Sequence, residues 1–600
     1  MQLKPYLKGL RDSYLFYPLL AALFIFISLK PYYEEGSLIL GGEGSFIVDF
    51  LGHLEITIHN WVTRFGAGGP NFAIGSNAAH SFALALIDTF FVNPQVANFA
   101  LIFSMFYLPF LGTYFTALQI GSSHHLASLV GLFYLINPAT LEFLNSLNPW
   151  NAFAASLIPI LCGIIVRYYR DNLKLFFFYG ITTAIFSHAY TNAPLNIVIT
   201  LSSLISVYIV CIHLNGHVKF LEILRKSCLI MVSLFMFNFW WIASLFYFVQ
   251  DALSGYGRDF AQGWLVQSGA AVLSPIAKSF SLTQITQGTA FNFHGALYNS
   301  SMGILVTLIP FLLVLWLLFY VKTDHRFARL NFHIFIITLS ALFLLKGVSR
   351  PFGFIYQWMF DYIPFFVIFK TPQEKFGLLY TFFFSILLLS VLHSCKTNKI
   401  YPKAILCLCG YLLFCAIPFL TGNIIPDYYA NPYGTVSRKY FDAPEYLKAR
   451  KSINKDKLNY RVLSLPGRGN YQALLDSGGT NLYSGLDPVL LNTNKPIVNA
   501  HDGDIHKVLY HNIFKPKSNL ILDFLSIKKL TLNDGFLNWF GKVGPGDRES
   551  LKQYFKSLSY ERYGSIRIYD RGAEFLPLFS SPDSVALSFQ WDNFKVIGEP

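Results

Sequence analysis

The sequence predicts a polytopic α-helical membrane protein with a C-terminal extracytoplasmic α+β domain. Of its 600 residues, 54% are hydrophobic and only 13% are charged, whereas a soluble protein carries about 25% charged residues. Apolar stretches close to the length of a membrane span recur up to residue 421, and charge, glycine and proline become more frequent after it. We therefore expect a transmembrane domain over residues 1–421 and a soluble domain over residues 422–600.

About eleven transmembrane helices are expected, because a span needs roughly 20 apolar residues. The candidate stretches are 14–29, 97–118, 125–141, 152–169, 175–192, 195–214, 227–250, 301–321, 331–346, 376–393 and 403–421. Residues 77–92 are apolar too, but Asp88 and Asn93-Pro94 interrupt them. This interruption predicts a re-entrant or interfacial helix.

The distribution of Lys and Arg predicts how the chain is oriented. If the N-terminus is cytoplasmic, nearly all the inner loops carry Lys or Arg, and the short outer turns 142–151 and 191–194 carry none. We expect a multi-pass protein of the inner or plasma membrane, anchored by an uncleaved segment at 14–29. Loops 30–96, 251–300 and 347–375 and the C-terminal domain would be extracytoplasmic.

The net charge of +13 does not indicate nucleic acid as a partner. Many of the basic residues flank apolar segments, where they set membrane orientation. The sequence has no basic helix and no basic patch with interleaved aromatic residues. We expect membrane lipid, and not nucleic acid, to contact this protein.

In the soluble domain, short strand-like runs predict strands, and longer runs with a helical pattern predict helices. Strands are expected at Tyr460–Leu465 and Ser565–Tyr569, and helices at Glu445–Lys455 and Arg548–Leu558. About 170 residues are enough to bury a separate hydrophobic core.

The first outer loop carries two candidate catalytic carboxylates. Glu43 stands among glycines in Gly41-Gly42-Glu43-Gly44, and Asp49 follows shortly after. A carboxylate is suited to deprotonate an acceptor hydroxyl. Apolar residues at helical spacing over Leu51–Val62, including Trp61, predict an interfacial helix that holds this loop at the membrane. The alternative for Asp49 is a helix N-cap, and the alternative for both carboxylates is a solvated loop.

Loop 347–375 supplies candidate phosphate-binding residues. Lys370 and Lys375 stand on the expected outer side just before a span, where positive charge opposes the orientation rule. Binding a lipid phosphate would account for them, and snorkelling of the side chains to the interface is the alternative. Arg350 supports the same interpretation more weakly.

Loop 251–300 contains Arg258 and His294 among aromatic and amide residues, a weak pattern for sugar binding. No cofactor motif is present. The turn His501–His506 has enough ligands for a divalent cation, but it lacks the spacing of a calcium loop, and we interpret it as a polar turn. No metal ligands are assigned, and a divalent cation is left open as a cofactor.

These motifs resemble the GT-C class of polyprenyl-phosphate-sugar glycosyltransferases, and within it the arabinofuranosyltransferase-type and related YfhO-like membrane proteins. The resemblance rests on the Gly41–Gly44 loop, the helix with Trp61, the run Phe65-Gly66-Ala67-Gly68-Gly69 and the stretch Phe369–Phe376. It implies a GT-C-like membrane domain and an inverting transferase. Its partners would be a polyprenyl-phosphate-linked sugar donor and a glycan, lipid or protein acceptor.

By this resemblance Glu43 or Asp49 acts near the acceptor, although the usual family residue is an aspartate. Trp61, Arg258, His294 and Glu374 are the expected substrate-binding residues. The alternatives are a non-enzymatic lipid or polysaccharide transporter and an envelope assembly scaffold. The apolar segments are almost free of ionisable residues, which favours an enzyme over a transporter.

Overall fold

The structure is a computed structural model. It describes residues 15–33, 50–57, 61–62, 69–70, 75–91, 93–145, 149–255, 297–298, 300–320, 325–422, 424, 443–458, 460–465, 474–475, 495, 497–498, 522–523, 526–533, 536–537, 555–556, 558–564 and 566–572. The chain forms two compact units, which we call the helical unit (1–35 and 72–438) and the sheet unit (36–71 and 439–600).

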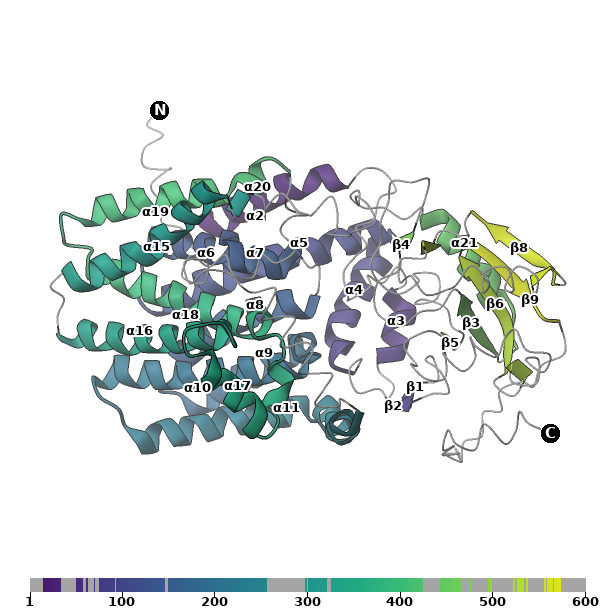
Figure 1. Ribbon diagram of the computed structural model, residues 1–600, viewed down its shortest axis with the longest axis horizontal. Coiled ribbons are helices and arrows are strands. Elements are labelled where there is room, and N and C mark those ends of the chain that lie inside the picture. The colour runs from purple at the N-terminus through teal and green to yellow at the C-terminus, as the bar shows by residue number, and fades with distance from the viewer. Residues whose placement is uncertain are drawn as a thin grey trace. The chain divides into compact units, whose positions relative to one another are not determined.

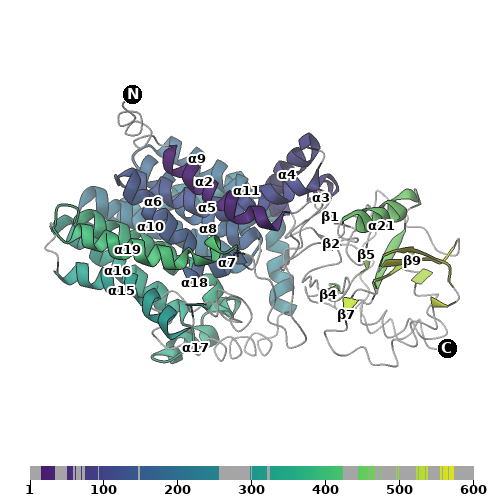
Figure 2. The same ribbon diagram turned by 90° about the horizontal axis from the view of Figure 1, so that it is seen from above.

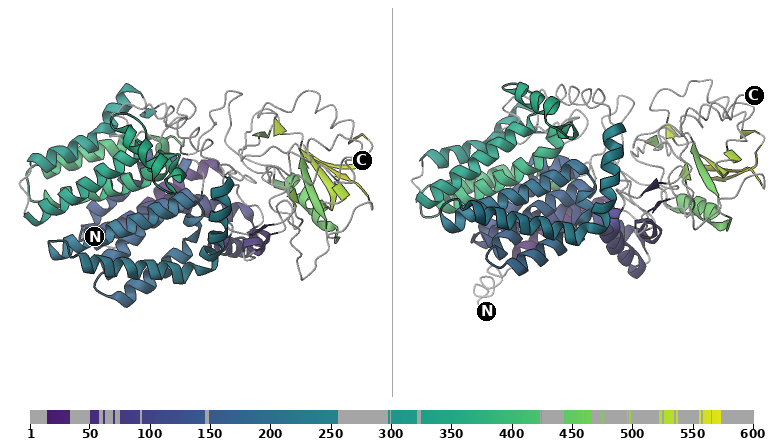
Figure 3. Two further views of the ribbon diagram at one scale, coloured as in Figure 1. Left: turned by 60° about the horizontal axis from the view of Figure 1, so that its bottom comes forward. Right: turned by 90° about the horizontal axis from the view of Figure 1, so that it is seen from below.

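The helical unit consists of long helices that run side by side (Figures 1 and 3). Its α-helices are α2 (Phe16–Leu29), α4 (Ala78–Phe91), α5 (Pro94–Gln119), α6 (His124–Ile136), α7 (Pro138–Asn145), α8 (Pro149–Tyr168), α9 (Asn172–Ile185), α10 (Ala193–Asn215), α11 (Phe220–Gly255), α15 (Ser301–Tyr320), α16 (His325–Leu345), α17 (Gly353–Tyr362), α18 (Pro372–Ser394), α19 (Tyr401–Cys415) and α20 (Ile417–Leu420). Short 3₁₀ helices join them: η1 (Lys30–Tyr32), η2 (Gly75–Asn77), η3 (Ser187–Tyr190) and η5 (Phe366–Phe369).

Within the described part of the chain, six helices are long and apolar enough to cross a membrane. They lie in α5, α8, α10, α15, α16 and α18, and α2, α4, α6 and α19 are shorter apolar helices. Helices of this length and composition indicate a membrane protein. The expected number of about eleven spans stays a prediction.

Helix α18 forms the centre of the helical unit. Of its most apolar window, 94% is buried, against 33% for α15. Glycines let other helices approach closely: a Cβ on Gly163 of α8 would lie 2.6 Å from the Phe115 ring of α5. Small residues allow such close backbone approach between apolar helices. Helix α18 is therefore enclosed by other parts of the helical unit along most of its length.

Proline and asparagine set the beginning of α5. Pro94 occupies the first turn, and the side chain of Asn93 accepts a hydrogen bond from the Gln95 N–H at 2.9 Å. This N-cap ends the preceding apolar run, as the Asn93-Pro94 break predicted. The preceding run itself forms the helix α4.

The sheet unit contains helix α3 (Phe50–Thr57) and two short strands, β1 (Trp61–Val62) and β2 (Gly69–Pro70), which pair antiparallel. The helix expected over Leu51–Val62 is thus wrong at its C-terminal end, because Trp61 lies in a strand. Val62 is β-branched, which favours extended backbone, and pairing with Gly69-Pro70 gives this segment a partner strand.

The remainder of the sheet unit is built on a five-stranded sheet in the order β5-β3-β6-β9-β8. The elements are α21 (Ala443–Lys455), β3 (Arg461–Leu465), β4 (Leu474–Leu475), β5 (Ile497–Val498), β6 (Ile527–Asn533), β7 (Phe536–Leu537), β8 (Tyr560–Tyr563) and β9 (Ile566–Asp570). Strand β3 runs parallel to β5 and β6, whereas β9 runs antiparallel to β6 and β8.

Helix α21 packs on one face of this sheet. Ala449 and Ile453 of the helix share a buried cluster with Val462 of β3 and with Ile566 and Ile568 of β9. The strands expected at 460–465 and 565–569 are therefore present as β3 and β9, and the helix expected at 445–455 is α21. Most of the helix expected at Arg548–Leu558 lies outside the described residues.

Candidate functional site

The described residues include only part of the predicted site. Glu43, Asp49, Arg258 and His294 lie outside them, as does the turn 501–506. The backbone of Glu374 is in the first turn of α18, and that of Trp61 is in β1. The side chains of Arg350, Lys370 and Lys375 are described, and these three basic residues define the candidate site.

Lys375 is a buried cation at the start of the central helix. Pro372 opens α18, and Lys375 stands in its first turn with 6% of its surface exposed. A buried ammonium group needs a partner, and Lys370, Thr371 and Lys375 each have one. The free N–H groups of a helix N-terminus add positive potential. This place therefore favours an anionic group.

Aromatic packing fixes the backbone that leads into Lys370. The hydroxyl of Tyr356 in α17 donates a hydrogen bond to the Phe369 carbonyl at 2.7 Å. The ring of Phe369 packs against Phe366 and Phe376, with centroids 5.2 and 4.8 Å away. Lys370 directly follows this segment and is half-buried. The hydrogen bond from Tyr356 and the packing of the Phe369 ring thus hold in place the backbone that precedes Lys370.

The turn that carries Arg350 lies against the same helix start. Gly347 has a φ of +58°, and a Cβ there would lie 2.6 Å from Cγ of Pro372. Lys346 donates hydrogen bonds to the carbonyls of Ser349, at 2.8 Å, and Pro351. The structure therefore brings the turn after α16 next to the Lys370–Lys375 segment. The Arg350 side chain itself is exposed.

The sequence did not predict a second polar cluster, which we call the η2–η3 junction. The Thr191 hydroxyl donates to Asn77 Oδ1 at 2.9 Å and lies 2.8 Å from the Ser76 hydroxyl. His188 Nδ1 donates to the same Asn77 oxygen, and Ser187 donates to the Ser76 carbonyl. These bonds tie the entry to α4 to the turn between α9 and α10.

Two imidazole rings stack beside this junction. His80 and His188 lie 4.7 Å apart with ring planes at 16°, and Phe153 packs edge-on against both. The Nε2 atom of His80 is buried and has no hydrogen-bond partner. Burial lowers the pKa of His80 to about 4, so the ring is neutral at physiological pH. The ring therefore packs as an uncharged group.

The junction and the lysines belong to the same end of the helical unit, which we call the η3 end. Helix α10 begins directly after η3, and it contacts both η3 and η5. The only sequence signal for the junction was the polar run Ser187–Asn192 between two apolar segments. A run of this kind looks like an ordinary turn, so the pattern did not single out His188 or Asn77.

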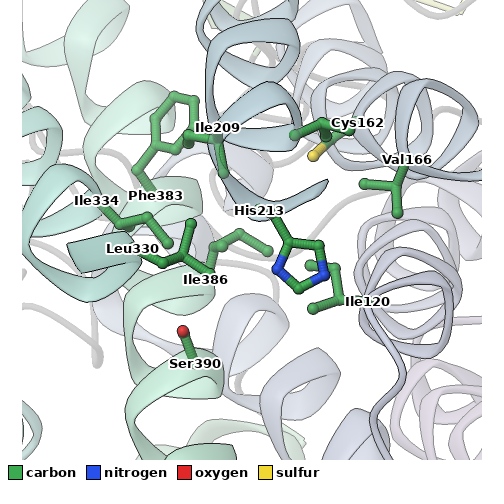
Figure 4. Close-up of a pocket in the computed structure, with 11 residues that line it drawn as sticks. Ile120, Cys162, Val166, Ile209, His213, Leu330, Ile334, Phe383, Ile386 and Ser390 are labelled. Carbon is green, nitrogen blue, oxygen red and sulfur yellow. The ribbon is translucent and has the colours of Figure 1, made fainter. Parts of the chain in front are cut away.

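An apolar cavity lies near the opposite end of the helical unit (Figure 4). It is lined by Ile120, Cys162, Val166, Ile209, Val210, His213, Leu330, Ile334, Phe383, Ile386 and Ser390. These residues come from the C-terminal halves of α8, α10 and α18, the N-terminal half of α16 and the end of α5. The lining contains no carboxylate, lysine or arginine. This cavity therefore lacks the groups that sugar transfer from a phosphate would need.

Among the described residues, no group of three or more His, Cys, Asp or Glu side chains is placed to hold a metal ion. The candidate cation turn at 501–506 lies outside those residues. The candidate site at the η3 end is defined by Arg350, Lys370 and Lys375, together with the N-terminus of α18.

No family model matches the chain, and no curated protein matches it either. Solved structures do. A cryo-EM structure of arabinofuranosyltransferase AftD from mycobacteria matches with a TM-score of 0.60 at 12% identity, over 94% of this chain and 40% of that one. Two structures of a mutant of that enzyme match with TM-scores of 0.59 and 0.51 at 11% and 12% identity, each over 94% of this chain and 42% of the other.

This chain spans about two fifths of the length of those structures. At such low identity the likeness shows a shared fold. The fold is shared with an arabinofuranosyltransferase, the type of protein that the sequence motifs resemble.

Proposed function

We propose that this protein is a membrane glycosyltransferase that moves a sugar from a polyprenyl-phosphate donor to an extracytoplasmic glycan, lipid or protein acceptor. The observation that carries the proposal is the buried Lys375 in the first turn of the central helix α18, next to Lys370. A helix N-terminus with adjacent lysines is suited to bind phosphate. The fold shared with an arabinofuranosyltransferase supports the same conclusion.

The proposed reaction inverts the configuration at the sugar. Glu43 or Asp49 takes the proton of an acceptor hydroxyl, and the acceptor oxygen attacks the anomeric carbon. The bond from that carbon to the phosphate oxygen breaks, and its electron pair leaves with the polyprenyl phosphate. Lys370 and Lys375 bind the donor phosphate before reaction and stabilise the charge on it as it departs. A general base of this kind typically contributes about 10²–10⁴-fold to the rate.

The other predicted residues have supporting roles in this proposal. Arg350 binds the donor phosphate from the exposed turn next to α18. Trp61, Arg258, His294 and Glu374 bind the sugar or the acceptor. The chain lies in the cell membrane with its N-terminus in the cytoplasm, residues 1–421 form the membrane domain, and residues 422–600 are extracytoplasmic. A divalent cation is not required by this scheme.

A transporter is the second candidate, and the described spans argue against it. Across the six candidate spans, the charged residues are Arg167, Arg329 and Lys375, each within three residues of a span's end. Transport pathways usually carry ionisable groups deep within the membrane. The described spans therefore fit an enzyme with its chemistry at one end better than a path across the bilayer.

The test is sugar transfer by the purified chain in liposomes that contain a labelled polyprenyl-phosphate sugar and an acceptor glycan. Lys375→Met should lower the rate by about 10-fold or more, because a hydrogen bond to a charged group is worth about 1.5–3 kcal/mol. Lys403→Met is the matched control, since Lys403 also follows a proline in a first helical turn, that of α19, and is exposed. We expect it to retain full activity.

Glu43→Gln and Asp49→Asn identify the base, and we expect one of them to lose transfer by about 10²-fold or more. Full activity of Lys375→Met would show that the phosphate assignment is wrong. If the wild-type chain transfers no sugar but moves labelled lipid between the leaflets, the transporter replaces the enzyme.

A further inference from the structure

Helix α17 presents a large apolar face outward. The exposed fractions of Phe354, Ile355, Trp358 and Tyr362 are 71%, 37%, 55% and 72%. At 100° per residue these four side chains occupy one face about 100° wide. Figure 2 shows α17 at the edge of the helical unit. The residues that flank the helix, Phe352 and Phe365, are exposed as well. The outward face is therefore continuous and largely aromatic.

The opposite face of α17 is already occupied. Gly353, Tyr356 and Phe360 are buried, and Tyr356 packs against Phe366 of η5 with ring centroids 5.2 Å apart. The polar residues Gln357 and Asp361 bond to each other at 3.0–3.1 Å along one edge of the helix. The helix thus has one face buried against the rest of the protein, a narrow polar edge and a large exposed apolar face.

Water is a poor environment for this apolar face. Soluble proteins rarely expose contiguous apolar patches of this kind without a partner. The helix has 10 residues and is about 15 Å long, too short to span a bilayer. In the chain it follows α16 and precedes α18, which are two candidate spans. It therefore lies at the level where α16 ends and α18 begins. Trp and Tyr at that level are typical of the membrane–water interface.

We propose that α17 lies in the lipid–water interface at the η3 end, with Phe354, Ile355, Trp358 and Tyr362 inserted among lipid acyl chains. The partner is the bilayer itself. A membrane suits both the apolar face and the polar edge of the helix. The apolar face contacts acyl chains, and Gln357 and Asp361 contact headgroups and water. Arg350, exposed in the preceding turn, lies at the headgroup level.

The interfacial position has a structural consequence. Because Tyr356 on the buried face holds the carbonyl of Phe369, the depth of α17 in the lipid sets the height of the adjacent Lys370. The interfacial position of α17 itself does not depend on the proposed sugar transfer. It would hold equally for a transporter with this fold.

Quenching of tryptophan fluorescence by brominated lipid tests the proposal on the full chain. The protein has nine tryptophans, so the contribution of Trp358 is the difference between the wild type and Trp358→Phe in phosphatidylcholine vesicles. Bromine at a shallow acyl position should remove more of this difference than bromine near the bilayer centre. Trp241→Phe is the control, because Trp241 is 3% exposed and its contribution should lose little to either lipid.

Iodide quenches tryptophan fluorescence from the aqueous phase, so it measures whether Trp358 is exposed to water. If iodide removes the Trp358 contribution and brominated lipid does not, α17 faces water and the proposal is overturned. If neither quenches it, another protein surface covers the helix, for example a second copy of this chain, and the proposal is overturned as well. A loss greatest at the deep bromine position would also overturn the interfacial placement. The conservative Trp358→Phe change keeps an aromatic ring on the exposed face, so the fold should not be disturbed.

Discussion

His188 donates its Nδ1 proton to the side-chain oxygen of Asn77, and this bond joins two segments that are 111 residues apart in the chain. Because an amide oxygen only accepts hydrogen bonds, the bond assigns the proton to Nδ1. Asn77 ends η2, directly before α4, and His188 lies in η3, directly before α10. The bond therefore fixes where the chain enters the helical unit after the first loop.

Replacing each of the two stacked histidines by phenylalanine should give different results. His188→Phe removes the bond to Asn77 within a buried site and should lower the free energy of unfolding by about 1–3 kcal/mol. His80→Phe removes both ring nitrogens, of which the buried Nε2 has no hydrogen-bond partner, and it should change stability by less than about 0.5 kcal/mol or increase it. Thermal unfolding in detergent at pH 7 measures both changes. Equal losses in the two variants would contradict this account.

The same pair predicts a pH dependence. The pKa of His80 is about 4 in the folded protein, because burial disfavours the charged ring, against 6.5 for an exposed histidine. Between these values the unfolded chain binds the proton and the folded chain does not, so stability falls as the pH drops from about 6.5 towards 4. His80→Phe removes this contribution. The free energy of unfolding of this variant, relative to that of the wild type, should therefore increase as the pH is lowered through this range. A difference that does not change with pH would argue against a neutral His80.

Two glycines test how tightly the helices pack. Alanine at Gly180 of α9 would place its Cβ 2.2 Å from Cδ2 of Phe237 and 2.7 Å from the Ser233 hydroxyl, both in α11. The Phe237 ring cannot easily move, because Phe176 and Phe177 pack against it. Gly180→Ala should therefore cost about 1–3 kcal/mol through overpacking, measured as a lower Tm in detergent.

Gly410 of α19 supplies the matched control. A Cβ there would meet nothing within 4 Å, and alanine favours a helix over glycine by about 1 kcal/mol. Gly410→Ala should leave Tm unchanged or raise it. A similar loss of Tm in both variants would show that the change acts through the unfolded chain or through detergent binding, and not through contact between α9 and α11.

The sequence was informative where one local signal decides the structure. Asn93-Pro94 marked the break that separates α4 from α5, although the span was expected to begin at residue 97, and alternating residues marked β9. It was uninformative where contacts between distant segments decide, as for Asn77 and His188. Trp61 shows the same limit: its helical spacing continued that of α3, but pairing with Pro70 placed it in a strand.

The candidate site was predictable to a similar degree. Lys370 and Lys375 stood out because their charge opposed the expected orientation, yet spacing alone did not distinguish phosphate binding from snorkelling. The 6% exposure of Lys375 argues against snorkelling, which requires the ammonium group to reach water. Burial of one lysine depends on the packing of the whole of α18, so it could not be read from neighbouring residues.

In the sheet unit, the ion pair between Lys528 and Asp456 should make stability depend on acid. Burial alone would raise the pKa of Asp456, but hydrogen bonds from Lys528 and from the Leu458 N–H outweigh it and hold the pKa below 3.8, its ordinary value. Above that value the pair contributes fully, and its contribution is lost as the pH falls through the lowered pKa. Asp456→Asn should cost about 1–3 kcal/mol at pH 7, and the cost should shrink below about pH 3.8.

Hydrogen exchange of the β3 and β6 amides in the full chain measures this cost, after correction for the pH dependence of intrinsic exchange. Asp570→Asn is the control, since that carboxylate is 40% exposed and lies 4.0 Å from the Lys528 ammonium; a smaller effect is expected. A cost of Asp456→Asn that is the same at pH 3 and pH 7 would mean that the charge of Asp456 does not stabilise the sheet unit.

The hydroxyl of Tyr356 should influence the affinity for the donor without taking part in the chemistry. Tyr356→Phe keeps the ring in its buried position and removes the hydrogen bond to the Phe369 carbonyl, next to Lys370. Such a bond is worth about 0.5–1.5 kcal/mol, so KM for a polyprenyl-phosphate sugar should rise by about 2- to 10-fold while kcat changes little. Tyr362→Phe in the same helix is the control, because its side chain is 72% exposed. If kcat falls and KM does not, Lys370 acts in the transition state alone, and its proposed role in holding the donor phosphate before reaction is wrong.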